Sequence, residues 1–211
     1  MVAKFEPMER DPGCSHCAGG SDPLAALGID AVYCISLVEQ PDHTALAARH
    51  FHAIGLCPVV FYRPKRERNA DIAIWRSHRA VVKEALSHGY KRVLVLEDDA
   101  RFSRPIAAFA SRILRAQAAL PKQWWGLYLG HLPYQAYFIG PGVVRARSTC
   151  LHAYIANAPL LDWLANTPPQ SLDAPMWSHV GLSVDAATAN LPHMGTSNND
   201  VFGAWLNAVA G

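Results

Sequence analysis

Residues 91–102 read KRVLVLEDDARF and join four consecutive aliphatic residues to three consecutive acidic ones. An aliphatic run without alternation is typical of a strand buried on both faces, as in a parallel sheet that helices cover. The acids Glu97, Asp98 and Asp99 follow at the carboxyl end of this strand, the edge where open α/β sheets bind ligands. The segment therefore predicts a central strand and, directly after it, a candidate site.

Three adjacent carboxylates repel one another and need a partner. A hard divalent cation with oxygen ligands, Mg²⁺ or Mn²⁺, that also bridges to a phosphate satisfies both the charges and the geometry. The alternative is an exposed acidic turn without function.

The chain before this segment alternates between strand and helix patterns. Residues 31–38 and 57–62 are short β-rich apolar runs, and apolar residues recur at helical spacing between Asp42 and Ile54, before Gly55. A second helix is expected to be capped by Asp71. This order predicts an α/β, Rossmann-like fold with a mostly parallel central sheet covered by helices.

Composition excludes several classes of protein. With 211 residues, 51% of them hydrophobic, the chain suits one globular domain, expected over residues 30–211 after a tail or irregular cap at 1–29. A formal net charge of +2 gives no overall electrostatic footprint for nucleic acid. The absence of a signal-like start or of a spanning apolar run indicates a cytoplasmic protein, with peripheral association at the inner membrane face left open. Cys14 and Cys17 form an isolated CxxC pair without a second half, which does not favour a zinc or redox site.

Residues 63–68, RPKRER, place four cations in six positions after the second predicted strand. This segment is either a solvated loop or a loop that faces a phosphate at the carboxyl edge of the sheet.

Two classes of protein place acids after such a strand. Response-regulator receiver domains also need a phospho-accepting aspartate on a later strand, but no Asp or Glu occurs between Asp99 and Asp162. The order of motifs instead resembles glycosyltransferase family 25, of GT-A architecture, which includes lipopolysaccharide and collagen galactosyltransferases. The likeness spans about residues 31–202 and rests on blocks at residues 32–42, 54–56, 74–78, 94–100, 125–130, 148–155, 171–177 and 191–200.

The resemblance implies a hexosyltransferase that moves galactose or a related sugar from a UDP-linked donor to a hydroxyl of a glycan such as lipopolysaccharide. It implies that Glu97 and Asp99, or the pair Asp98 and Asp99, bind Mn²⁺ (or Mg²⁺), with His193 completing the ligand set. The residues it implies at the nucleotide are Ser36, Leu37, Arg76, His78 and Asp98.

Direct displacement also needs a carboxylate that takes the proton of the acceptor hydroxyl. Four acids follow the acidic triad. Asp162 is expected on the solvent face of a helix. Asp173 is the preferred base because it lies at a matched motif, with Asp185 and Asp200 behind it.

Two alternatives remain open at this point. The basic segment at 63–68, together with Arg76 and Arg79, suggests a modified nucleobase in DNA as the acceptor. Ser36 and His43 stand where the family carries Asn and Arg, which suggests a relative that binds nucleotide or glycan without turnover.

Overall fold

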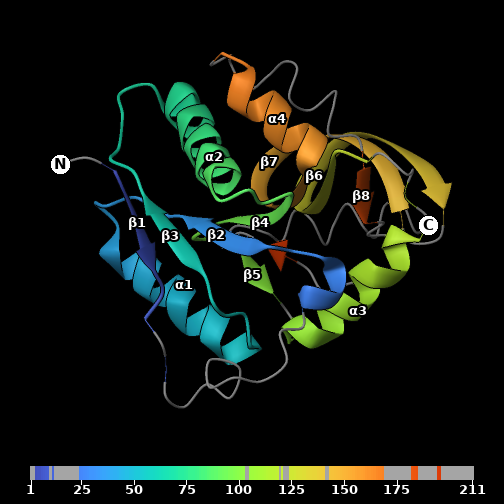
Figure 1. The fold of residues 1–211 in the computed structure, drawn as a ribbon, viewed down its shortest axis with the longest axis horizontal. Coiled ribbons are helices and arrows are strands. Elements are labelled where there is room, and N and C mark those ends of the chain that lie inside the picture. Colours follow the sequence, from blue (N-terminus) through green and yellow to red (C-terminus); the bar gives the residue numbers. More distant parts are fainter. Residues whose placement is uncertain are drawn as a thin grey trace.

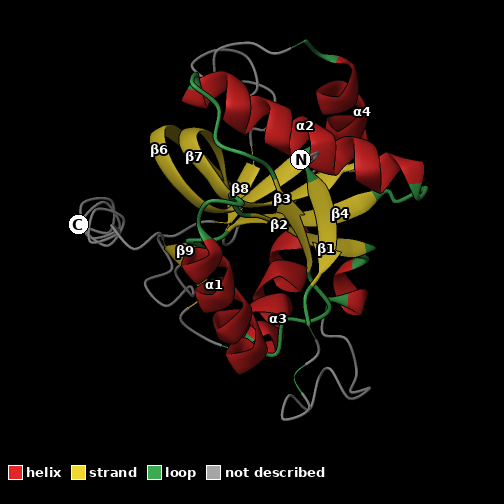
Figure 2. Cartoon of the chain, turned by 90° about the vertical axis from the view of Figure 1, so that its left-hand side faces the viewer, coloured by secondary structure: helices red, strands yellow, loops and turns green. Residues whose placement is uncertain are grey.

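A computed structural model describes residues 3–9, 11, 24–102, 105–118, 120, 124–140, 143–168, 182–184 and 194–195. Its centre is a seven-stranded sheet with helices on both faces (Figures 1 and 2). In sheet order the strands are β1 (Lys4–Pro7), β3 (Val60–Arg63), β2 (Ala31–Ile35), β4 (Arg92–Glu97), β7 (Val143–Asn157), β6 (Gly126–Gly140) and β8 (Leu182–Val184). The α/β class is therefore confirmed.

Helices α1 (Pro41–Ile54) and α3 (Ile106–Gln117) cover one face of the sheet, and α2 (Ala70–Ser87) and α4 (Ala158–Asn166) cover the other (Figure 2). A short 3-10 helix, η1 (Ala25–Leu27), precedes β2. Two further strands, β5 (Arg101–Phe102) and β9 (Met194–Gly195), pair with each other in a small separate sheet.

The sheet is mixed rather than mostly parallel. Strands β3, β2 and β4 are parallel, as the alternation of strands and helices predicts. Strand β7, however, runs antiparallel to both β4 and β6. Only two residues separate β6 from β7 in sequence, so these strands have no room for the crossover that parallel pairing requires. The parallel part near the acidic triad is therefore the β3-β2-β4 unit.

Strand β4 is buried on both faces, as its sequence predicts. Leu94 and Leu96 belong to the core on the side of α1 and α3, whereas Val93 and Val95 belong to the core on the side of α2 and α4. All four side chains are fully buried. Burial of an aliphatic side chain contributes roughly 1.5–3 kcal/mol, so this short strand anchors both halves of the core.

Local signals set several helix ends. Gly55 follows α1 with φ +77°, a left-handed conformation that suits glycine. The prediction that Asp71 caps the second helix is wrong, because the Asn69 side chain accepts the hydrogen bond from the Ile72 amide at 3.1 Å. Asn69 has the extended backbone of a cap residue, while residue 71 already lies inside the helix.

The first 29 residues contain regular structure that the sequence reading does not foresee. Strand β1 adds antiparallel to the edge of β3, and Leu24 and Leu27 are buried in the core. Cys14 and Cys17 lie outside the described residues. No helix in the described part of the chain is both long and apolar enough to cross a membrane.

Candidate functional site

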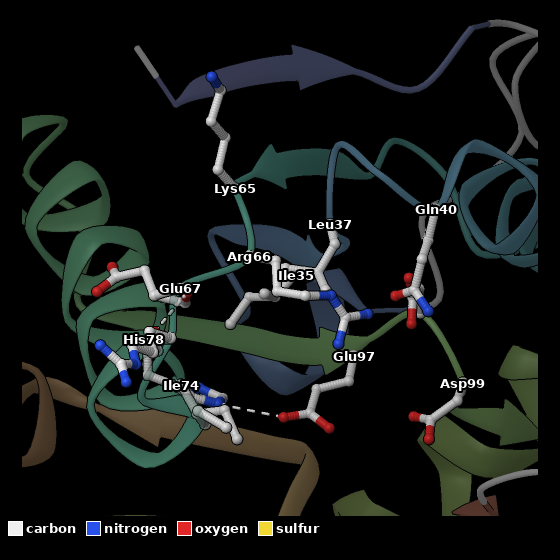
Figure 3. Close-up of a pocket in the computed structure, with 15 residues that line it drawn as sticks. Ile35, Leu37, Gln40, Lys65, Arg66, Glu67, Ile74, His78, Glu97 and Asp99 are labelled. Carbon is white, nitrogen blue, oxygen red and sulfur yellow. Dashed lines mark hydrogen bonds and ion pairs between the residues drawn. The ribbon is translucent and has the colours of Figure 1, made fainter. Parts of the chain in front are cut away.

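The carboxyl ends of β2, β3 and β4 meet around a cavity of about 510 Å³. Backbone hydrogen bonds hold the connecting segments together there: the Val38 amide donates to the Pro64 carbonyl at 2.9 Å, and the Asp98 amide donates to the Ile35 carbonyl at 3.1 Å. Lys65, Arg66, Glu97 and Asp99 all line this cavity, and Figure 3 shows the Lys65 side chain directed away from the two acids. Basic and acidic residues therefore share one cavity at the edge where parallel sheets bind ligands.

Glu97, the last residue of β4, contacts a buried histidine. His78 of α2 is 1% exposed, and its Nε2 lies 3.4 Å from Glu97 Oε1. On its other side, His78 Nδ1 lies 3.0 Å from the hydroxyl of Tyr154, a fully buried residue of β7. Burial alone would raise the pKa of Glu97, but the hydrogen bond and charge of His78, with a contribution from His152, outweigh it and hold that pKa below its usual value.

Asp98 belongs to a second, partly buried network. The Ser36 hydroxyl donates to Asp98 Oδ2 at 2.6 Å and accepts a hydrogen bond from Arg63 Nη1 at 2.9 Å. The same Arg63 nitrogen also donates to the Thr44 hydroxyl. Arg63 is only 8% exposed, although the sequence suggested a loop cation, because it is the last residue of β3. A buried guanidinium thus reaches the carboxylate through one hydroxyl.

Asp99 differs from both of its neighbours. Its Oδ1 is buried and has no hydrogen-bond partner among the described residues. Burial, followed by the charges of Glu97 and Asp98, raises the pKa of Asp99 to about 6. The repulsion that the sequence predicts therefore raises the pKa of one carboxylate, the one whose Oδ1 has no hydrogen-bond partner among the described residues.

Within the described residues, no three His, Cys, Asp or Glu side chains converge as a preformed metal cage. Mg²⁺ does not require one, because proteins bind it through one or two carboxylates while substrate phosphates and water supply the other ligands. The unpartnered, buried oxygen of Asp99 fits this mode. Glu97 and Asp98 fit it less well, since His78 and Ser36 already engage them.

The basic segment lines the cavity from Lys65 to Arg68, and these side chains are exposed. Within it, Glu67 Oε2 lies 2.5 Å from Arg76 Nη1 on α2. The Arg66 amide also donates to Glu39 Oε2 at 3.1 Å. Lys65, Arg66 and Arg68 therefore line the same cavity as the acids, and the phosphate-facing interpretation of this loop stays a prediction.

The structure brings together only part of the predicted site. Five predicted residues line the cavity: Leu37, His78, Glu97, Asp98 and Asp99. Ser36 is 1% exposed and lies behind Asp98 instead, and Arg76 pairs with Glu67 outside the cavity lining. Asp162 is exposed on α4, as expected.

The proposed bases Asp173, Asp185 and Asp200, and the proposed ligand His193, lie outside the described residues. Strand β9 begins at Met194, directly after His193 in sequence, and pairs with β5, which begins two residues after Asp99. Sequence reasoning did not foresee that Arg63 is buried or that Tyr154 contacts His78. For Arg63, its place at the end of an apolar strand was the available signal.

Comparisons with known proteins find solved structures only. No family model matches the chain, and no curated protein matches its sequence. Among 29 matching structures is a glycosyltransferase involved in glycosylation of the major capsid of PBCV-1, at 10% identity and TM-score 0.36, with 64% of this chain and 63% of that chain covered. The chain thus spans slightly less than two thirds of that protein.

Two nucleotidyltransferases match over more of the chain. An apo UDP-glucose pyrophosphorylase has 10% identity and TM-score 0.45, covering 89% of this chain and 84% of that one. A chain described as a glucose-1-phosphate thymidylyltransferase from Bacillus anthracis, in complex with sucrose, has 11% identity and TM-score 0.44, covering 96% and 84%. These likenesses are too distant to assign an activity to this chain.

Proposed function

We propose that the cavity at the β3-β2-β4 edge binds a nucleotide sugar together with a divalent cation, and that the protein transfers the sugar to a hydroxyl acceptor. The observation that carries this proposal is one cavity lined both by Asp99, whose Oδ1 has no hydrogen-bond partner among the described residues, and by the cations of a neighbouring loop. A diphosphate bridging a cation to basic side chains complements both walls.

Different residues of the chain bind the cation, the phosphates and the base. Asp99 supplies the protein ligand to Mn²⁺ or Mg²⁺, and Lys65, Arg66 and Arg68 contact the phosphate oxygens. Ile35, Leu37 and Ile74 give the cavity an apolar wall suited to the flat face of a base. When bound, the cation neutralises charge that develops on a departing nucleoside diphosphate.

The finer assignments rest on the resemblance to glycosyltransferase family 25 over residues 31–202. It supports a hexosyltransferase with a UDP-linked donor, Mn²⁺ and a glycan acceptor, in which Asp173 is the preferred base. The DNA alternative draws on Arg76 and Arg79, but Arg76 is paired with Glu67, and Arg79 Nε donates to the Ala165 carbonyl at 3.0 Å.

The test is release of nucleoside diphosphate from UDP-, GDP- and TDP-sugars, and of CMP from CMP-sugars, with a panel of glycan acceptors and with Mn²⁺, Mg²⁺ or EDTA. We expect metal-dependent release of the nucleotide from one class of donor, and we expect this release to rise when a suitable acceptor is present. Asp99→Asn is the variant that should lose it, and Asp162→Asn is the matched control on the exposed face of α4. Release that is unaffected by EDTA and by Asp99→Asn contradicts the proposal.

A further inference from the structure

A series of polar side chains in contact leads from strand β7 through the interior to the cavity. It begins at the Tyr154 hydroxyl on β7, passes through both ring nitrogens of His78 on α2, and ends at Glu97 on β4. Tyr154 and His78 are each 1% exposed, whereas the Glu97 side chain is 29% exposed and lines the cavity. Two buried residues thus support one residue that a ligand can reach.

The two contacts of His78 fix its ring from both sides. His78 Nε2 lies 3.4 Å from Glu97 Oε1, an ion-pair distance without hydrogen-bond geometry, and the Tyr154 hydroxyl lies 3.0 Å from Nδ1 on the other side. Because a carboxylate only accepts hydrogen bonds, we expect Nε2 to carry the proton. Neither contact competes with water, because both nitrogens are buried. The ring orientation, and with it the position of one Glu97 oxygen, is therefore determined by Tyr154.

The direction of the Glu97 carboxylate completes this arrangement. Figure 3 shows one Glu97 oxygen directed toward His78, while the group as a whole lies between His78 and Asp99. With Oε1 occupied by the histidine, Oε2 is the oxygen that remains for a ligand. A freely rotating glutamate would present either oxygen and would have to be ordered when the ligand binds.

We propose that His78, oriented by Tyr154, is a positioning residue that locks the Glu97 carboxylate so that a single oxygen is presented to the nucleotide-sugar ligand. This inference rests on the proposed function of the cavity. It assigns to His78 a role that acts through Glu97, in place of the direct nucleotide contact that the resemblance implies, and it gives a supporting role to Tyr154, which does not line the cavity.

The experiment compares matched substitutions in the full chain. His78→Gln keeps an N–H donor toward Glu97, whereas His78→Leu removes it at similar volume. Tyr154→Phe removes only the hydroxyl. Tyr33→Phe is the control, since Tyr33 is also buried in the core on the α2 side but does not line the cavity. Release of nucleoside diphosphate is measured for kcat and KM, and thermal melting is measured for each variant.

Loss of a residue that orients a metal ligand typically lowers metal affinity or activity 10- to 100-fold, and we use the same range for a carboxylate oriented toward a nucleotide-sugar ligand. We expect about this loss in kcat/KM for His78→Leu and Tyr154→Phe, partial recovery in His78→Gln, and wild-type values for Tyr33→Phe. Tyr154→Phe and Tyr33→Phe should melt within a few degrees of each other. Unchanged kcat/KM in His78→Leu or Tyr154→Phe, or no recovery in His78→Gln, overturns the inference.

A second measurement keeps this inference separate from the proposed function. Urea unfolding of His78→Leu, Glu97→Gln and the double variant requires no ligand. If the two side chains are coupled, the double variant unfolds at a higher midpoint than the sum of the single shifts predicts. Absence of any turnover in the wild type overturns the proposed function, whereas additive midpoints overturn the positioning contact itself.

Discussion

The two walls of the cavity carry opposite charges, and different contacts hold them in place. On the acidic wall, Glu97 and Asp98 contact His78 and Ser36, each of which is 1% exposed. On the basic wall, Glu67 forms an ion pair with Arg76, which lies outside the cavity lining, and the two side chains are 40% and 57% exposed. Exposed pairs contribute little and are screened by salt, whereas buried charges are expensive to leave unpaired. The acidic wall is therefore preorganised by the fold, and the basic wall is adjustable.

The largest expected effect tests the buried support of the acidic wall. Arg63→Ala removes the guanidinium that reaches Asp98 through Ser36, and breaking a buried charged network costs about 3 kcal/mol of unfolding free energy. Urea unfolding measures the loss. Arg66→Ala, on the basic wall, should change the same quantity by less than about 0.5 kcal/mol. Equal losses in the two variants would remove the distinction between the walls.

The next effect concerns how Asp99 changes the unfolding free energy with pH when no metal is bound. Its pKa in the folded protein is about 6, above its usual 3.8, so the folded state binds this proton more tightly than the unfolded state does. The contribution of Asp99 to unfolding free energy therefore falls as pH rises from about 4 to 6. The pKa of Glu97 is lowered instead, so its contribution to unfolding free energy is lost as the pH falls below its usual pKa of 4.5.

Asp99→Asn should accordingly be more stable than the wild type at pH 7 by about 1 kcal/mol, a value reduced for solvent screening. The difference should shrink as the pH falls toward 4. Urea unfolding at several pH values in the presence of EDTA measures it. A variant that is less stable than the wild type at pH 7 would show that Asp99 is not repelled by its neighbours.

A smaller effect is expected on the basic wall. Lys65→Ala, Arg66→Ala and Arg68→Ala should each weaken nucleotide binding by about 0.2–1 kcal/mol, at most about fivefold, because these side chains are exposed. Calorimetric titration at low and high NaCl should show the difference from wild type shrinking as salt rises. A salt-independent loss would indicate that the loop buries its cations when the ligand binds.

The smallest effect concerns the acid within the basic loop. Glu67→Gln breaks the exposed pair with Arg76 and should change the unfolding free energy by less than about 0.5 kcal/mol. Nucleotide affinity should rise slightly, since a negative charge leaves the phosphate side of the cavity. A loss of affinity comparable to that of Arg66→Ala would mean that Glu67 orders the loop.

Sequence reasoning succeeds where the signal is local. The aliphatic run of β4 and Gly55 at the end of α1 each report on their own neighbourhood, and both agree with the structure. The supports of the site are not local. Ser36 and Asp98 are 62 residues apart, and His78 and Tyr154 are 76 apart, so only the packed fold shows that they meet.

Contacts between distant segments also make the three carboxylates of the acidic wall unequal. From sequence, Glu97, Asp98 and Asp99 are equivalent carboxylates, and any two of them could hold a cation. Folding makes them unequal, because α2 brings His78 to the first and β2 brings Ser36 to the second. The antiparallel placement of β7 beside β4, which puts Tyr154 behind His78, also depends on contacts between distant segments.

The central claim is that Asp99 holds a divalent cation against the diphosphate of a nucleotide. The most direct measurement is a calorimetric titration of wild type and Asp99→Asn with UDP, GDP, TDP and CMP, each with Mn²⁺ and with EDTA at pH 7.5. The account predicts that one nucleotide binds the wild type at least about 100-fold more tightly with Mn²⁺, a difference of about 2.7 kcal/mol, and that Asp99→Asn abolishes the difference. Metal-independent binding, or an equal effect of Mn²⁺ on Asp99→Asn, would contradict it.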